Sequence, residues 1–143
     1  MVAKEYLESY KQIQTRINVL QSEINRLRTE AESVSINIDG MPKGTATDDK
    51  LSRIVSVMAD LEKTMLDEMS GLYIRRMRII TLLGKLKSHK HQLLLQKRYI
   101  ECKSWERIAV EMDITWRHCY RLHGSALNEF EKVMEYEHRT NRC

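Results

Sequence analysis

The sequence predicts an all-α protein, in which a long antiparallel helical hairpin precedes a smaller helical domain. Among 143 residues there are one proline and five glycines, and 31% of the residues are charged while only 6% are aromatic. That balance is typical of helical proteins with little or no sheet. Apolar residues also recur at steps of three and four over long stretches, which is the period of a helix that packs along one face. We therefore expect two parts, residues 1–87 and residues 88–143.

The first long helix is expected from about Val2 to Ser35. Its apolar positions alternate steps of four and three without a break, which is the spacing of a coiled-coil seam. At 1.5 Å per residue this helix has a length on the order of 50 Å. The seam consists of Tyr6, Tyr10, Ile13, Ile17, Leu20, Ile24, Leu27, Ala31 and Val34.

A loop is expected over residues 37–49, which hold two glycines, the only proline and several small polar residues. Thr47 or Asp48 then caps a second long helix that reaches about Lys87. Since neither apolar seam can stay exposed, the two helices are expected to form an antiparallel hairpin. The apolar positions of the second helix include Leu51, Ile54, Met58, Leu61, Met65, Met69, Leu72, Ile79 and Leu83.

A two-helix hairpin has a single contact layer, so some of its apolar side chains are left over. The apolar side chains that this layer leaves uncovered include Met58, Met65, Met69 and Met77. A stripe of methionines is nevertheless most often part of an ordinary hydrophobic core. Most protein assemblies are symmetric homo-oligomers. We therefore expect the N-terminal half to form a homodimer.

A short helix from His89 to Tyr99, capped by Ser88, is expected to lead into the most informative stretch of the chain. In that stretch, Ser104 can cap one helix and Thr115 the next, because a hydroxyl oxygen accepts a free backbone N–H at a helix start. Between them, Asp113 and Ile114 form a tight turn. The apolar residues of the two helices fall on inward faces: Ile108, Ala109, Met112, Cys119, Leu122, Ala126 and Leu127. This pattern predicts a helix-turn-helix, which sets its second helix into the major groove of DNA.

The residues left on the outer side of that unit are basic, aromatic or hydroxylic. Such side chains are better suited to contacts with base edges and phosphates than to exposure to water alone. The side chains expected to read bases are Trp116, Arg117, His118, Tyr120 and Arg121. Those expected to contact phosphate are Lys97, Arg98, Lys103, Ser104, Arg107 and Thr115.

Positive charge is concentrated just before the helix-turn-helix. Residues 72–103 hold nine Lys and Arg against the single acid Glu101, a net charge of +8, whereas the whole chain carries +4. Clustered cations bind polyanions by releasing counterions, and this binding weakens with salt. A solvated helix face is the ordinary explanation of such a block. Because this basic block directly precedes the helix-turn-helix pattern, we expect double-stranded DNA to be its ligand.

The same stretch resembles region four of bacterial sigma factors. The resemblance rests on Arg98-Tyr99, residues 104–109 (Ser-Trp-Glu-Arg-Ile-Ala), Ile114-Thr115, Cys119 and Ala126-Leu127. The whole chain is similar in layout to a group of small phage and prophage proteins that have a sigma-like domain behind a helical N-terminal half. The resemblance implies a transcription regulator that reads a short DNA element, with RNA polymerase as a possible further partner.

The chain departs from that family at three positions. Cys102 stands where a glycine usually precedes the first helix, and Asp113 stands where a glycine usually forms the turn. A short aspartate tolerates the left-handed backbone that such turns need. Ser125 replaces a usual arginine, which removes one expected phosphate contact.

Two other functions compete with transcription regulation. A phage DNA-packaging protein of the small-terminase kind also joins a helix-turn-helix to helical assembly segments, but there the motif usually comes first in the chain. In the other alternative, the C-terminal domain binds RNA polymerase or a regulator, and DNA binding is incidental. The C-terminal position of the motif favours regulation over packaging.

No pattern in the sequence indicates an enzyme, a cofactor or a metal site. There is no P-loop, dinucleotide fingerprint or catalytic triad arrangement. Cys119 and His123 lie four residues apart, with Cys102 and His118 nearby, but a small buried thiol explains Cys119 better than zinc does. Three unpaired cysteines, no apolar run of about 18 residues and no signal peptide suggest the cytoplasm, in association with the nucleoid.

Overall fold

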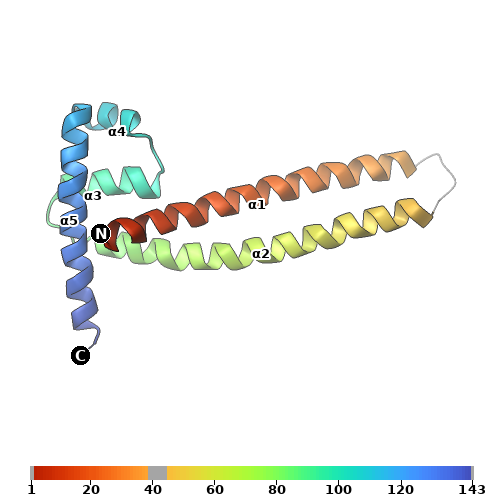
Figure 1. Ribbon diagram of the computed structural model, residues 1–143, viewed down its shortest axis with the longest axis horizontal. Helices are drawn as coiled ribbons and strands as arrows, with labels where there is room; N and C mark the ends of the chain where they lie inside the picture. Colours follow the sequence, from red (N-terminus) through yellow and green to blue (C-terminus); the bar gives the residue numbers. More distant parts are fainter. Residues whose placement is uncertain (1, 39–44, 143) are drawn as a thin grey trace. The chain divides into compact units, whose positions relative to one another are not determined.

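The computed structural model describes residues 2–38 and 45–142, and within them it contains helices and no strand. The predicted all-α class is confirmed. None of the helices in these ranges is both long and apolar enough to cross a membrane. The elements, in chain order, are α1 (Val2–Ile38), α2 (Thr45–Leu83), α3 (His89–Leu95), a π-helical turn (Gln96–Ile100), α4 (Trp105–Met112) and α5 (Trp116–Thr140) (Figure 1).

The chain divides into two compact units. One consists of residues 13–71, and the other joins residues 1–12 to residues 72–143. The division differs from the predicted boundary at residue 87. The start of α1 and the end of α2, about three turns of each, pack with the C-terminal helices. These segments belong together because residues from both ends of the chain contribute side chains to one hydrophobic core.

Within residues 13–71, α1 and α2 run antiparallel. Arg16 pairs with Glu68 at 3.1 Å and Arg28 pairs with Glu62 at 3.9 Å, so the partner number falls as the α1 number rises. The buried side chains of this unit are Ile24, Leu27 and Ile54. The other predicted seam residues of this unit are half-buried, with one exception.

The exception is Met69, which we predicted to be a seam residue and which is 45% exposed. The neighbouring Glu68 takes the inner position because its carboxylate bonds to Arg16 across the hairpin. The ends of α2 also differ from prediction. The helix begins at Thr45, so Thr47 and Asp48 lie inside its first turn and not before it, and it ends at Leu83 instead of Lys87.

The unit formed by residues 1–12 and 72–143 contains a continuous hydrophobic core. Side chains from α1, α2, α3, the π-helical turn, α4 and α5 contribute to it. Those with no exposed surface are Ala3, Leu7, Tyr10, Ile79, Leu94, Leu95, Ile108, Cys119, Ala126 and Phe130. The burial of Cys119 confirms the prediction of a small core thiol, and burial raises the pKa of that thiol.

The predicted N-terminal caps of α3, α4 and α5 are confirmed. The hydroxyl of Ser88 accepts the backbone N–H of His91, that of Ser104 accepts from Arg107, and that of Thr115 accepts from His118, over 3.1 to 3.3 Å. The helix predicted from His89 to Tyr99 is α-helical only to Leu95. It then widens into the π-helical turn, where the backbone N–H of Glu101 donates to the carbonyl of Gln96.

Among residues 2–38 and 45–142, two that are not glycine adopt a left-handed backbone, Cys102 with φ 55° and Asp113 with φ 53°. For an ordinary residue this conformation costs roughly 1–2 kcal/mol. At Asp113 the turn nevertheless forms, because the N–H of Ile114 donates to the carbonyl of Ala109 over 3.0 Å and closes the end of α4.

Candidate nucleic-acid interface

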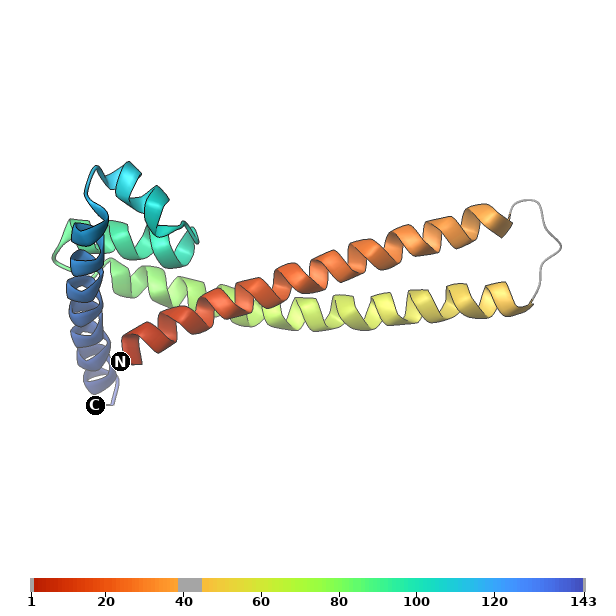
Figure 2. The same ribbon diagram turned by 45° about the horizontal axis from the view of Figure 1, so that its top comes forward.

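Helices α4 and α5 are joined by a three-residue connection, Asp113 to Thr115. Figure 2 shows α4 next to the first turns of α5. Ile108 and Ala109 of α4 are buried, as are Cys119, Ala126 and Leu127 of α5. The apolar faces predicted for the two helices are therefore the faces that pack. Their opposite sides are left to water or to a ligand.

The five side chains predicted to read bases are all exposed on the first two turns of α5. Arg117 and Arg121 lie one turn apart, and neither has a hydrogen bond or ion pair within the part of the chain that the structure describes. Two unpaired guanidinium groups with this spacing can reach one ligand together. His118 is exposed beside them.

The aromatic residues of this surface form a connected series. Trp116 meets Tyr120 edge-on with ring centroids 4.8 Å apart, and Tyr120 lies 5.5 Å from Trp105. Trp116 and Tyr120 are each 47% exposed, while Trp105 is half-buried against the core. The series ties the start of α5 to the start of α4, so the outer aromatic rings are held by the inner one.

His123 completes the series on the inner side. Its ring lies edge-on to Trp105 at 4.6 Å, and its Nε2 is hydrogen-bonded to the hydroxyl of Tyr99 over 2.9 Å. Since the ring of His123 also stacks on that of Tyr99, with centroids 5.9 Å apart, His123 connects Trp105 to Tyr99. Burial, with Lys4 and Arg98 nearby, lowers the pKa of His123 to about 4. Burial, with Glu8 nearby, raises the pKa of Tyr99 to about 12.

The lowered pKa of His123 predicts a loss of stability in mild acid. In the unfolded chain this imidazole takes up a proton near pH 6.5, whereas in the folded protein it stays neutral down to about pH 4. The free energy of unfolding should therefore fall as the pH drops from 6.5 to 4, by up to about 1 kcal/mol per pH unit, and then level off. Urea unfolding at several pH values measures this slope. His123→Gln should flatten it, while His118→Gln should retain it.

The lysines and arginines predicted to contact phosphate have partners inside the protein. Lys97, Lys103 and Arg107 all converge on the carboxylate of Glu111, at 3.0, 2.9 and 3.3 Å. The hydrogen bonds from Lys103 and Lys97 lower the pKa of Glu111 to about 2. Lys103 also pairs with Glu101 at 3.1 Å. We call Lys97, Lys103, Arg107 and Glu111 the Glu111 cluster.

The remaining predicted phosphate contacts are engaged in local structure as well. The guanidinium of Arg98 lies 4.5 Å from the centroid of the Trp105 ring and donates a hydrogen bond to the carbonyl of Lys103 over 3.0 Å. A cation over an aromatic face contributes about 0.5–2 kcal/mol. Ser104 and Thr115 are exposed, and their hydroxyls cap α4 and α5.

The basic block that the sequence showed before α4 is thus largely partnered. Arg75 donates to Ser9 over 2.6 Å, Arg76 donates to the hydroxyl of Tyr10 over 3.3 Å, and Lys85 pairs with Glu137. The partners come from α1 and α5, far away in sequence, which is why the charge count alone missed them. One signal was available nearby: Arg107 and Glu111 are four residues apart on one helix, the spacing of a helical ion pair.

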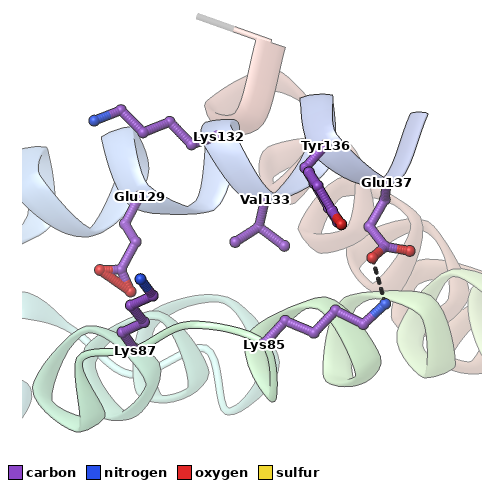
Figure 3. A pocket seen from close by; sticks show the side chains of 7 residues that line it. All are labelled: Lys85, Lys87, Glu129, Lys132, Val133, Tyr136 and Glu137. Atoms are coloured by element: carbon purple, nitrogen blue, oxygen red, sulfur yellow. Dashed lines mark ion pairs between the residues drawn. The ribbon is translucent and has the colours of Figure 1, made fainter. Parts of the chain in front are cut away.

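A hollow of about 600 Å³ lies between the segment around Lys85 and the second half of α5. Figure 3 shows Lys85 and Glu137 joined by an ion pair at one end, with Val133 between the two walls. Glu129, at the other end, accepts the backbone N–H of Ser88 over 3.2 Å. The carboxylates of this hollow therefore hold α5 to the segment between α2 and α3.

Within the described residues, no three His, Cys, Asp or Glu side chains are grouped so that they could hold a metal ion. Comparison of the chain with protein-family models, with curated proteins and with solved structures found no match.

Proposed function

We propose that this protein is a sequence-specific regulator of transcription that binds double-stranded DNA, reading a short element with the first two turns of α5. The observation that carries the proposal is the pair Arg117 and Arg121, exposed and without a partner in the described structure, next to the Thr115 cap. In a helix-turn-helix these N-terminal turns enter the major groove, while the first helix crosses the backbone.

The chemistry of the outer side of α5 suits base edges. An arginine donates two parallel hydrogen bonds to guanine, and an apolar ring surface contacts the methyl group of thymine. Arg117 and Arg121 supply the first kind of contact, and Trp116, held edge-on by Tyr120, supplies the second. With DNA as the ligand, the expected location is the nucleoid in the cytoplasm, and a phage origin follows from the resemblance.

A second candidate is a protein-interaction module that binds RNA polymerase, with incidental DNA contacts. The Glu111 cluster favours it, because three cations that were expected to grip phosphate are already paired. Tight and salt-sensitive DNA binding separates the two candidates. A DNA-packaging role has no supporting observation beyond the resemblance in layout, and it would require ring assembly in solution.

Binding to duplex DNA should weaken steeply with salt. For a handful of phosphate contacts, the affinity should fall by about two powers of ten between 50 and 200 mM salt, because each contact releases condensed counterions. Fluorescence anisotropy with a labelled random-sequence duplex measures this dependence, and selection from a random DNA pool supplies the preferred site. No binding at 50 mM salt, or affinity that is flat with salt, would remove the DNA proposal and leave the interaction module.

We further infer that the protein forms a homodimer. Tyr73, Met77 and Ile80 lie at steps of four and three on α2 and are 66%, 47% and 43% exposed, so they form one apolar face that water alone covers in the single chain. Light scattering of the full-length chain at tens of micromolar should give twice the mass of one chain. A mass of 16.9 kDa, that of the monomer, would contradict the inference.

A further inference from the structure

We propose that Lys97, Lys103 and Arg107 form a preorganised cradle for a phosphate group of the nucleic-acid backbone, and that Glu111 occupies this cradle in the free protein and competes with the phosphate. This inference rests on the proposed function. The carboxylate of Glu111 stands in for the oxyanion, so it is an internal competitor that limits binding without regard to sequence.

The geometry shows that the three cations meet at one carboxylate, that of Glu111, while Lys103 also pairs with Glu101 at 3.1 Å. Three cations from three places in the chain, the π-helical turn, the loop after it and α4, direct nitrogen atoms at the two oxygens of one carboxylate within 3.3 Å. Lys97 and Lys103 are held in place, with side chains only 15% and 27% exposed. Without an anion at the centre, three positive charges at this spacing would repel one another. The site therefore requires a negative occupant.

A phosphate group meets the same requirements as the carboxylate. It presents several oxygens to charged N–H donors and bears a full negative charge, and the hydrogen bonds between such ions are among the strongest in proteins. Arg107 keeps 69% of its side chain exposed, so the cradle is open to a ligand on one side. The cluster also lies on α4 and just before it, and the first helix of a helix-turn-helix is the one that crosses the DNA backbone.

The expected consequence for DNA recognition is a lower affinity for unspecific sequence. A phosphate must displace Glu111 before the three cations can bind the phosphate. This displacement reduces the favourable electrostatic free energy of binding to DNA of unspecific sequence. Arg117 and Arg121 have no such competitor. The internal carboxylate thereby shifts the balance of binding from phosphate contacts toward base reading.

The test removes the competitor and keeps the cradle. Glu111→Gln should bind a random-sequence duplex about tenfold more tightly than wild type at 50 mM salt, and its affinity should fall more steeply with salt, by roughly one extra phosphate contact. The matched control is Glu106→Gln, which removes the same charge from the same helix at an exposed position. It should gain less than about threefold, because salt screens a distant charge.

A second readout does not depend on DNA. Inorganic phosphate, compared with chloride at equal ionic strength, should raise the melting temperature of Glu111→Gln, since a ligand that binds only the folded state stabilises it. Wild type and Glu106→Gln should respond less. The Glu111 carboxyl, with a pKa of about 2, is ionised throughout ordinary buffers, so it occupies the cradle of wild type at the pH of this measurement.

Arg107→Gln provides a second test that does not depend on the folding of Glu111→Gln, because the exposed side chain of Arg107 contributes little to packing. It should weaken binding to the random duplex and make the salt dependence shallower by about one contact. Equal affinities and equal salt slopes for wild type, Glu111→Gln and Arg107→Gln would overturn the cradle while leaving DNA binding intact. If none of the folded variants binds DNA at 50 mM salt, the proposed function itself fails.

Discussion

Replacing Arg117 or Arg121 with alanine should abolish most of the preference for the selected DNA site. A guanidinium that is bidentate to guanine contributes about 1–3 kcal/mol of discrimination, so each variant should lower the ratio of specific to random-sequence affinity by roughly 5- to 150-fold. Both side chains are exposed and free of internal partners in the described structure, so their loss should leave stability unchanged. Anisotropy with the selected and a scrambled duplex, at the same salt concentration, gives the ratio.

Arg139→Ala is the matched control for that experiment. It removes the same charge from the last turn of the same helix, far along α5 from the connection to α4. Its affinity for both duplexes should fall slightly and by the same factor, so the ratio should not change. If the Arg117 and Arg121 variants keep the wild-type ratio, α5 does not read bases, and the interaction module becomes the better account.

Replacing Leu7 with alanine should destabilise the C-terminal helices, although position 7 lies about ninety residues before them. Leu7 has no exposed surface and belongs to the core that α3, α4 and α5 share. Truncating a buried leucine costs about 2–5 kcal/mol, because apolar contacts are lost and a cavity remains. The chain has two tryptophans, in α4 and α5. Urea unfolding followed by tryptophan fluorescence should therefore report the loss directly.

Val19→Ala provides the comparison on the same helix. Val19 is 63% exposed and lies in the other compact unit. An exposed valine in a helix contributes little, and alanine has the higher helix propensity, so stability should change by less than about 0.5 kcal/mol. A Leu7→Ala protein as stable as wild type by tryptophan fluorescence would contradict the packing of α1 with the C-terminal helices.

Local signals in the sequence were sufficient for much of the fold. The period of the apolar residues predicted both long helices, and single hydroxyl side chains predicted the starts of α3, α4 and α5 at Ser88, Ser104 and Thr115. The turn at Asp113 was predicted in the same way. These features depend on neighbours within one or two helical turns, so the residues that determine them lie side by side in the sequence. The exposure of Trp116, Arg117 and Arg121 followed from the same period.

Other features depend on contacts between distant segments, and only the tertiary structure decided them. Leu7 and Tyr10 join the C-terminal core because α3, α4, α5 and the π-helical turn need apolar surface from both long helices to close that core. Glu68 displaces Met69 from the hairpin seam because Arg16 lies opposite it.

The residues predicted to contact phosphate show the limit of the sequence most clearly. Lys97, Lys103 and Arg107 are basic by sequence, but whether a cation is free depends on which acid the fold brings to it. A count of charged residues gives the net charge of the basic block but does not show which cations are paired with carboxylates. The sequence by itself determined the two long helices, the caps of α3, α4 and α5, and the outer face of α5. The pairing of Glu111 with three cations depended on the tertiary structure, because a salt bridge requires a distance within about 4 Å that only packing sets.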